Sequence, residues 1–341
     1  MPHALRALLP LALGALLGAG PAAHASSGQE RAQAAGSSLI GKPAPALTLT
    51  TIDGREIDLA SLYGRKAVYL KFWATWCVPC REQMPHFERT FEQAGPDLAV
   101  IAVDAGFNDS LADVRAYRAS VGLRMPIAVD DGRLADALNL RVTPQHVVIG
   151  RDGRIAYVGH LVDDRLEAAL AAARAAPADA GAGARAPRVP VLAELGVGAN
   201  VGAASVKRED GTAFPLKDPA GAHSTVVMFL SPWCESYLAS SRPERAAACR
   251  RAREQSEQLA KDAGRRWIGI ASGLWASAED LAEYRDTQKV SVPLALDGDG
   301  TWFRRFGVRD VPEFVVVGPD GRITARIETA GADLRRQLAA R

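Results

Sequence analysis

The stretch that decides the fold is FWATWCVPCREQMP, Phe72 to Pro85, in which Cys77 and Cys80 lie three positions apart. It overlaps the apolar run AVYLKFWA (67–74), which is typical of a strand buried on both faces. The residues after Cys77 predict a helix. Two cysteines three apart at a helix start lie on the same side and can close a disulfide. The stretch therefore predicts a strand, then a helix, with a cysteine pair at the junction.

This cysteine pair has the pattern of a redox site. Cys77 is predicted at the helix N-terminus, where free N–H groups and the helix dipole favour a thiolate, so we expect an exposed nucleophile. Cys80, one turn later, is expected to be the buried resolving thiol that releases a mixed disulfide. Pro79 fits the first turn, whose N–H groups lack helical partners. Trp76 is expected to support the site.

Two other uses of the pair are less favoured. A zinc site needs a second ligand pair, and the sequence has no further CxxC or HxxxH at zinc spacing. A purely structural bridge across so short a loop gains little chain entropy. We therefore expect redox activity at Cys77 and Cys80, with no metal and no cofactor.

The chain contains this unit twice. VYLKFWATWC (68–77) matches VVMFLSPWC (226–234), with the two Trp-Cys pairs 157 residues apart. Three later stretches recur at offsets of 167 to 168, namely VIAVDAG (100–106), PIAVDDG (126–132) and VTPQHVVIGRDGRI (142–155). The offset grows by about ten, so an insertion follows the second Trp-Cys pair.

Each unit alternates strands and helices and ends in a proline-led strand and a DGRI hairpin, which predicts an α/β fold with a central mixed sheet flanked by helices. The turns TIDGREI (51–57) and REDGTAF (208–214) predict an added N-terminal hairpin in each unit. We assign residues 40–173 to the first domain, 174–188 to an Ala/Gly/Pro linker, and 189–341 to the second domain.

The beginning of the chain indicates export. Residues 1–25 contain a short apolar run followed by AHA, which predicts a signal peptide cut after Ala25. The alternative, an uncleaved anchor, needs roughly 20 apolar residues, and the run is shorter. Residues 26–39 are assigned to a flexible segment. We expect a periplasmic protein without a transmembrane segment in the mature chain.

The composition is that of a globular protein. The 341 residues are 48% hydrophobic and carry a net charge of +2, with no basic stripe, so nucleic acid is not an expected partner. All four cysteines lie after the predicted cleavage site, and an exported chain can hold them as disulfides.

The motif KFWATWCVPCREQMP, together with VTPQHVVI and the stretch that begins GKPAPALTL, resembles the TlpA/ResA-like thiol-disulfide oxidoreductases of the thioredoxin superfamily. The resemblance covers Ile40 to about Leu170. It implies two tandem thioredoxin-like folds, the second degenerate. It also implies that Pro144 is cis beside the cysteine pair, and that the backbone of Thr143 pairs with substrate. The alternative is an ordinary trans proline that opens a strand.

The resemblance further implies a protein-disulfide reductase that faces the periplasm. Its clients would be disulfide-bearing proteins of the cytochrome c maturation or copper-centre assembly type, and a membrane electron donor would re-reduce it. The sequence leaves the client, the donor, the direction of electron flow and the oligomeric state open.

One residue departs from the thioredoxin pattern. Lys71 stands six residues before Cys77, where thioredoxins carry a buried acid. If its amine reaches the cysteines, we expect it to lower a cysteine pKa and make the pair more oxidising. The alternative is that Lys71 extends to the surface.

The second domain keeps the frame but not the CxxC motif. Cys234 aligns with Cys77, Trp233 with Trp76 and Pro312 with Pro144, whereas position 237 is Tyr. We expect Pro312 to be cis as well.

Cys249 is the candidate partner of Cys234. A continuous helix would separate them by ~22 Å, whereas a disulfide needs Cα atoms within about 7 Å. Arg242 before Pro243 breaks the helix between them. We therefore predict a Cys234–Cys249 disulfide, which is either structural, contributing ~3 kcal/mol, or a second redox centre.

Three other functions remain as alternatives. A thiol peroxidase would need a proline and a threonine ahead of a lone cysteine, where this chain has Val227 and Ser231 before Cys234. A copper-handling protein would need clustered Met and His, and the chain has only four Met and scattered His residues. The second domain could also bind clients without catalysing exchange.

Overall fold

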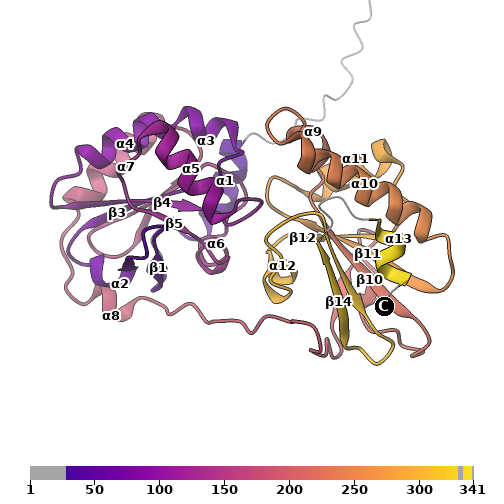
Figure 1. Cartoon of the computed structure of the whole chain (residues 1–341). Coiled ribbons are helices and arrows are strands. Elements are labelled where there is room, and N and C mark those ends of the chain that lie inside the picture. Colours follow the sequence, from indigo (N-terminus) through magenta and orange to yellow (C-terminus); the bar gives the residue numbers. More distant parts are fainter. Residues whose placement is uncertain (1–27, 329–332, 340–341) are drawn as a thin grey trace, which may run out of the picture.

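The structure, a computed structural model, describes residues 28–328 and 333–339. The predicted signal peptide therefore lies outside the described residues. Two α/β domains follow one another along the chain and lie side by side (Figure 1). None of the described helices is both long and apolar enough to cross a bilayer.

The first domain opens with a helix and a small hairpin, and a five-stranded sheet follows. Its strands are β1 (Thr48–Thr50), β2 (Glu56–Asp58), β3 (Ala67–Trp73), β4 (Leu98–Asp104), β5 (Ile127–Val129), β6 (Gln145–Ile149) and β7 (Ile155–Gly159). Its helices are α1 (Gly28–Ser37), α2 (Leu59–Leu62), α3 (Val78–Glu82), α4 (Met84–Glu92), α5 (Leu111–Val121), α6 (Arg133–Ala137), α7 (Asp164–Ala175) and α8 (Ala182–Arg185).

The second domain repeats this order, and its described residues form no counterpart of α1, α2 or α8. Its strands are β8 (Ser205–Lys207), β9 (Ala213–Pro215), β10 (Ser224–Leu230), β11 (Arg265–Ser272), β12 (Leu294–Asp297), β13 (Glu313–Val317) and β14 (Ile323–Glu328). Its helices are α9 (Cys234–Tyr237), α10 (Pro243–Leu259), α11 (Ala278–Gln288), α12 (Thr301–Arg305) and α13 (Leu334–Ala339).

The two large sheets have the same topology. Their strand orders are β5-β4-β3-β6-β7 and β12-β11-β10-β13-β14. The first three strands of each order are parallel and the last two run antiparallel to their neighbours. The predicted tandem thioredoxin-like folds are thus confirmed. The two predicted N-terminal hairpins are the pairs β1–β2 and β8–β9.

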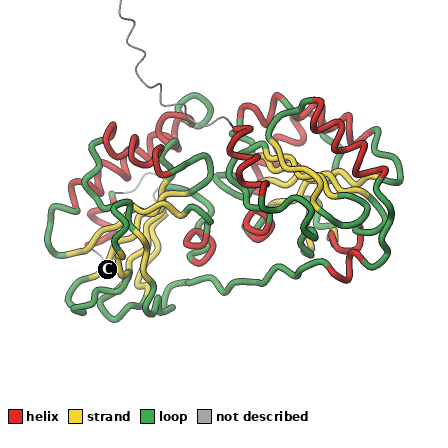
Figure 2. Tube along the Cα trace, turned by 180° about the vertical axis from the view of Figure 1, so that it is seen from behind, coloured by secondary structure: helices red, strands yellow, loops and turns green. Residues whose placement is uncertain are grey.

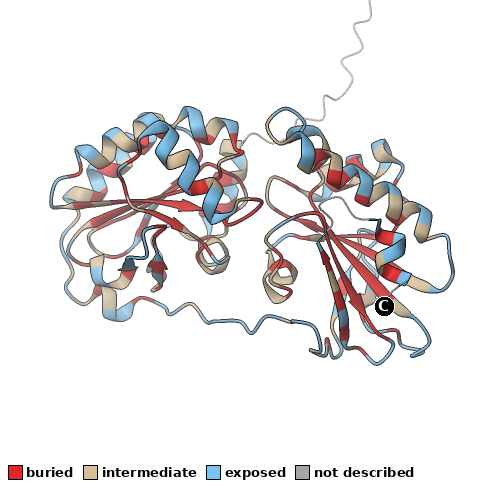
Figure 3. Ribbon diagram, viewed as in Figure 1, coloured by how far each residue is buried: buried red, intermediate tan, exposed pale blue. Residues whose placement is uncertain are grey.

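The central strands are buried on both faces, as their apolar sequences predict (Figure 3). One face of each sheet packs into an apolar cluster of its own domain. The other faces share a single cluster that runs from Trp76 and Phe107 in the first domain to Phe229 and Phe303 in the second. The core therefore continues across the boundary between the domains.

Two segments differ from the sequence prediction. Residues 28–37, assigned to a flexible segment, form α1, which packs on β7. Gly36 makes this approach possible, because an added Cβ would lie 2.3 Å from Cβ of Val158. In the predicted linker, α8 packs on α2, with Gly183 against the Ala60 carbonyl. Small residues here allow close packing, and composition alone cannot distinguish such packed segments from flexible linkers. The extended connection between the domains follows α8 (Figure 2).

Candidate functional site

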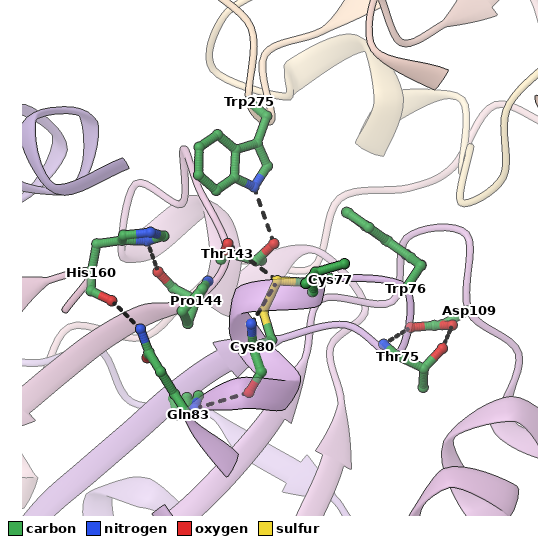
Figure 4. The surroundings of a disulfide bond; sticks show 12 residues. Thr75, Trp76, Cys77, Cys80, Gln83, Asp109, Thr143, Pro144, His160 and Trp275 are labelled. Carbon is green, nitrogen blue, oxygen red and sulfur yellow. Dashed lines mark hydrogen bonds between the residues drawn. A yellow bond between two sulfur atoms is a disulfide. The ribbon is translucent and has the colours of Figure 1, made fainter. Parts of the chain in front are cut away.

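The cysteine pair lies at the junction of β3 and α3 and forms a disulfide with the Cα atoms 5.2 Å apart (Figure 4). Cys77 is the N-cap residue of α3, and its Sγ accepts a hydrogen bond from the backbone N of Cys80 at 3.2 Å. Pro79 lies in the first turn of the helix. The free N–H groups at this helix start favour a thiolate at Cys77 once the disulfide is reduced.

A cis proline completes the site. The Thr143–Pro144 peptide bond is cis, as expected, and the Thr143 carbonyl oxygen lies 3.3 Å from Sγ of Cys77. The loop that carries these two residues thus faces the reactive sulfur (Figure 4). Trp76 packs beside the pair, and its Nε1 donates a hydrogen bond to the Phe107 carbonyl at 2.7 Å.

The expectation that Cys77 is exposed is wrong for the full chain. Cys77 is only 1% exposed, and Cys80 is fully buried. Residues of the second domain contact Val78, which follows Cys77 in the chain, and Thr143, whose carbonyl oxygen lies beside Sγ of Cys77. The Tyr237 hydroxyl accepts a hydrogen bond from the Val78 N–H at 3.0 Å, and Trp275 Nε1 donates one to Thr143 Oγ1 at 3.2 Å. The sequence of the first domain alone could not reveal this cover.

Lys71 is fully buried beneath the pair, so the alternative of a surface lysine is wrong. Its Nζ donates a hydrogen bond to the Cys80 carbonyl oxygen at 3.4 Å. Burial lowers the pKa of Lys71 to about 7. Its amine can therefore exchange a proton near neutral pH, next to the backbone of Cys80.

A polar network that the sequence analysis missed continues from Lys71. His146 pairs with Lys71 across β3 and β6, and its ring bonds the Tyr69 hydroxyl and Gln83 Oε1, both at 2.8 Å. Burial, and to a lesser extent Lys71, holds the pKa of His146 well below its usual value, so its ring is neutral. The signal available in the sequence was a lysine and a histidine inside two otherwise apolar strands.

The network returns to the cis proline. Gln83 Nε2 donates to the His160 carbonyl at 3.1 Å, and His160 Nδ1 donates to the Pro144 carbonyl at 2.6 Å. The helix that holds the cysteines and the loop that faces them are thereby joined through the half-buried Gln83 and the buried His160. Such fully bonded networks fix geometry, because an unpaired buried polar group is costly.

The cysteine of the second Trp-Cys pair also forms a disulfide. Cys234, at the start of α9, is bonded to Cys249 on α10, with Cα atoms 6.3 Å apart. The chain leaves the helical conformation at Arg242, directly before Pro243, where a new helix begins. Trp233 adjoins this pair, and the Val311–Pro312 bond is cis, as expected. Both cysteines are buried.

The chain is similar to known proteins over part of its length. The sequence profile of the AhpC/TSA family matches residues 40–158. Thiol-disulfide oxidoreductase ResA of Bacillus thuringiensis is 32% identical over 135 residues, which are 38% of this chain and 76% of ResA. Thioredoxin-like protein YneN of Bacillus subtilis is 33% identical over 133 residues, 38% of this chain and 78% of YneN.

Among solved structures, a thiol:disulfide interchange protein of the thioredoxin family from Chlorobium tepidum is similar. It is 26% identical, with 39% of this chain and 97% of that chain covered and a TM-score of 0.36. With the CxxC disulfide and the cis proline in place, the similarity to most of ResA decides the assignment: the chain belongs to the ResA-like thiol-disulfide oxidoreductases.

Proposed function

We propose that the protein is an exported protein-disulfide reductase that acts on client proteins through Cys77 and Cys80. The observation that supports this most directly is a CxxC disulfide at the start of α3, facing the cis Pro144 loop. Export to the periplasm is supported by the signal-like residues 1–25, and by two disulfides, which persist in oxidising compartments.

The reaction is a two-step exchange. The Cys77 thiolate attacks one sulfur of a client disulfide, and the second client sulfur leaves as a thiolate. The Cys80 thiolate then attacks Sγ of Cys77, releases the first client sulfur, and closes the Cys77–Cys80 disulfide. The client gains two electrons and the enzyme loses two. A membrane protein with a reactive dithiol is the proposed donor that restores the reduced enzyme.

Lys71 is proposed to favour the thiolate form of the pair. Its buried amine reaches the Cys80 carbonyl, and an ammonium group near a thiolate stabilises the charged form. Stabilising the reduced thiolates makes a dithiol pair more oxidising. We therefore expect this chain to be a weaker reductant than the same domain with an apolar residue at position 71.

The second domain is proposed to be a docking module, with Cys234–Cys249 as a structural bridge. Tyr237 stands at the position of a resolving cysteine and bonds the first domain instead, and the partner of Cys234 lies on the separate helix α10. The expected clients are those of the cytochrome c maturation or copper-centre assembly type, from the family resemblance. A second redox centre remains the alternative for this bridge.

Trapping tests the proposal. In Cys80→Ser, mixed disulfides at Cys77 cannot be resolved, so clients should accumulate as covalent adducts that mass spectrometry identifies after non-reducing electrophoresis. The wild-type protein should also reduce insulin disulfides in the presence of a dithiol. Cys77→Ser is the matched control and should yield no adduct. Absence of both adducts and insulin reduction would overturn the proposed activity.

A further inference from the structure

The two domains contact each other through equivalent residues of their repeats. Asn108 and Trp275 each stand two residues after the matched stretches VIAVDAG and WIGIASG. The Asn108 N–H donates to the Arg309 carbonyl, and the Trp275 N–H donates to the Arg141 carbonyl, both at 2.8 Å. Each domain therefore places the same loop against the cis-proline loop of the other.

The side chains of these loops make a second pair of reciprocal hydrogen bonds across the domain boundary. Asn108 Oδ1 accepts from the N–H of Val311 at 2.9 Å, and Trp275 Nε1 donates to Thr143 Oγ1 at 3.2 Å. Val311 and Thr143 are the residues that precede the two cis prolines. Figure 4 shows the Trp275 ring entering from the second domain above Thr143 and Cys77. The first domain's cis-proline loop, beside its reactive sulfur, is thus occupied by the second domain.

The backbone at these positions is strained. Asn108 and Trp275 have φ values of 55° and 57°, in the left-handed region that a bulky residue such as Trp rarely adopts. A bulky residue held there is under backbone strain and persists only where its surroundings fix it. The hydrogen bonds of Trp275 to Arg141 and Thr143 are the contacts that fix it, and both cross the domain boundary.

Aromatic packing extends the same contact. The rings of Trp76 and Trp233 stack with centroids 5.0 Å apart, and Phe107 lies 5.9 Å from Phe303 across the boundary. These residues belong to, or pack against, the apolar cluster shared by the two sheets. Separation of the domains would expose this apolar surface, so the docked arrangement is the favoured one.

The loop closed by the Cys234–Cys249 disulfide supplies further contacts. It carries Tyr237, which bonds the N–H of Val78, and Arg242, which bonds Thr75 Oγ1 at 2.5 Å and the Asn108 carbonyl at 3.0 Å. This loop contains the insertion that distinguishes the second repeat. The disulfide therefore fixes the shape of a segment that reaches the residues on both sides of the first Trp-Cys pair.

Arg242 also pairs with a buried charge. It contacts Asp109 Oδ1 at 2.5 Å, and the Asp109 side chain has no exposed surface. Thr75 donates two further hydrogen bonds to this carboxylate. Burial and the neighbouring Asp109 raise the pKa of Asp104 well above its usual value. Burial raises the pKa of Asp109 too, but the hydrogen bonds from Thr75 and the charge of Arg242 oppose this effect, so we assign the charge of the pair to Asp109. Loss of Arg242 would leave that charge without its partner.

We propose that the second domain is the resident occupant of the client-binding surface around Cys77, held there by the loop 234–249 and by Trp275, and that a client protein reaches Cys77 only by displacing it. The partner that this surface fits is a client loop that offers a backbone N–H to the Arg141 carbonyl and a side-chain donor to Thr143, as Trp275 does. This inference rests on the proposed disulfide exchange.

The connection between the domains permits displacement without unfolding. Val189 is hydrogen-bonded to Ala46 in the first domain, and Leu195 to Arg305 in the second. The five residues between can span up to about 20 Å when extended. Val191 and Leu192 in this segment are 78% and 45% exposed, so little packing holds it in place.

Alkylation of a single thiol tests the proposal without requiring turnover. In Cys80→Ser, Cys77 is the one thiol outside a disulfide, and its reaction rate with a maleimide-polyethylene glycol reports access. Adding Arg242→Ala and Trp275→Ala should raise this rate at least tenfold, the equivalent of about 1.4 kcal/mol of docking free energy. Arg335→Ala, an exposed position on α13 outside the loop 234–249, is the control and should leave the rate unchanged.

Two further measurements separate the possible outcomes. Small-angle scattering should give a larger radius of gyration for the double variant, and circular dichroism should show that its domains remain folded. An unchanged alkylation rate in a folded double variant would overturn the occupant role even if insulin is reduced normally. The other outcome is a raised alkylation rate in the double variant together with no insulin reduction by the protein that keeps both Cys77 and Cys80. That result would refute the proposed disulfide exchange, but the second domain would still be the occupant of the surface around Cys77.

Discussion

Trp76 and Trp233 occupy the same position in the two repeats, and their rings stack on each other across the domain boundary with centroids 5.0 Å apart. Each indole also donates to an equivalent carbonyl of its own domain, Phe107 and Leu274, at 2.7 Å. The residue before each aligned cysteine is thus part of the contact between domains, as well as of its own site.

Replacing Trp233 should uncouple the two domains. Trp233→Ala removes a partly buried ring that stacks on Trp76, and we expect a loss of about 2–3 kcal/mol, below the cost of a fully buried Trp→Ala. Differential scanning calorimetry should then resolve two transitions where the wild-type chain gives one. Trp267→Ala, in the apolar cluster of the second domain alone, serves as the control and should lower the temperature of a single transition. A single unshifted transition for Trp233→Ala would contradict a shared core.

Replacing Lys71 should change how stability depends on pH. Burial lowers the pKa of Lys71 from 10.5 to about 7, so between these values the unfolded chain binds a proton that the folded chain lacks. Stability from this group therefore rises with pH above 7, by at most about 1.4 kcal/mol per pH unit. Below pH 7 the buried ammonium destabilises the fold.

The direction of this pH dependence gives a specific expectation for a variant. Lys71→Met should be more stable than wild type at pH 6, and its advantage should shrink steadily between pH 7 and pH 9 in urea unfolding. Lys42→Met, at an exposed position, should show no such trend. An advantage that stayed constant over this range would mean that Lys71 remains charged in the folded protein.

The same substitution should also raise the thiol pKa. With the ammonium removed, we expect the pKa of the more acidic cysteine in the reduced pair to rise by about 1 unit, measured from thiolate ultraviolet absorbance. The reduction potential should become more negative in parallel. If neither quantity moves, Lys71 plays no part in tuning the pair.

Removing the second disulfide should affect stability far more than exchange activity. Cys234→Ser with Cys249→Ser should lower the free energy of unfolding by ~3 kcal/mol, the value expected for a closed loop of this size. Insulin reduction should remain at or above the wild-type rate, because the loop 234–249, which holds the second domain over Cys77, is loosened. A large loss of this activity in a folded variant would establish Cys234–Cys249 as a second redox centre.

The repeat, the alternation of strands and helices, and the positions of both cysteine pairs follow from patterns in the sequence. Apolar runs such as AVYLKFWA predict buried strands, and the Arg242–Pro243 step predicts a helix break that brings Cys249 back to Cys234. These features depend on residues close in the chain. The pairing of Lys71 with His146 depends on strand register, which a single sequence leaves undetermined.

The burial of Cys77 could not be predicted for a similar reason. It depends on Tyr237 and Trp275, which lie 159 and 132 residues from their partners Val78 and Thr143. Neither residue belongs to a recognisable motif. The prediction of a flexible segment before residue 40 is wrong for a different reason. Ala and Gly are common in flexible segments, but in α1 they allow the helix to pack tightly.

The equivalence of Asn108 and Trp275 has a consequence for how such a chain can evolve. A dimer of identical subunits must use one residue at both copies of a two-fold contact. Here the two copies are encoded separately, so one position has become a small amide that receives Val311 and the other a large indole that covers Thr143. Fusing the halves therefore frees each to specialise: one retains the chemistry, and the other can change its surface without altering the reactive cysteines.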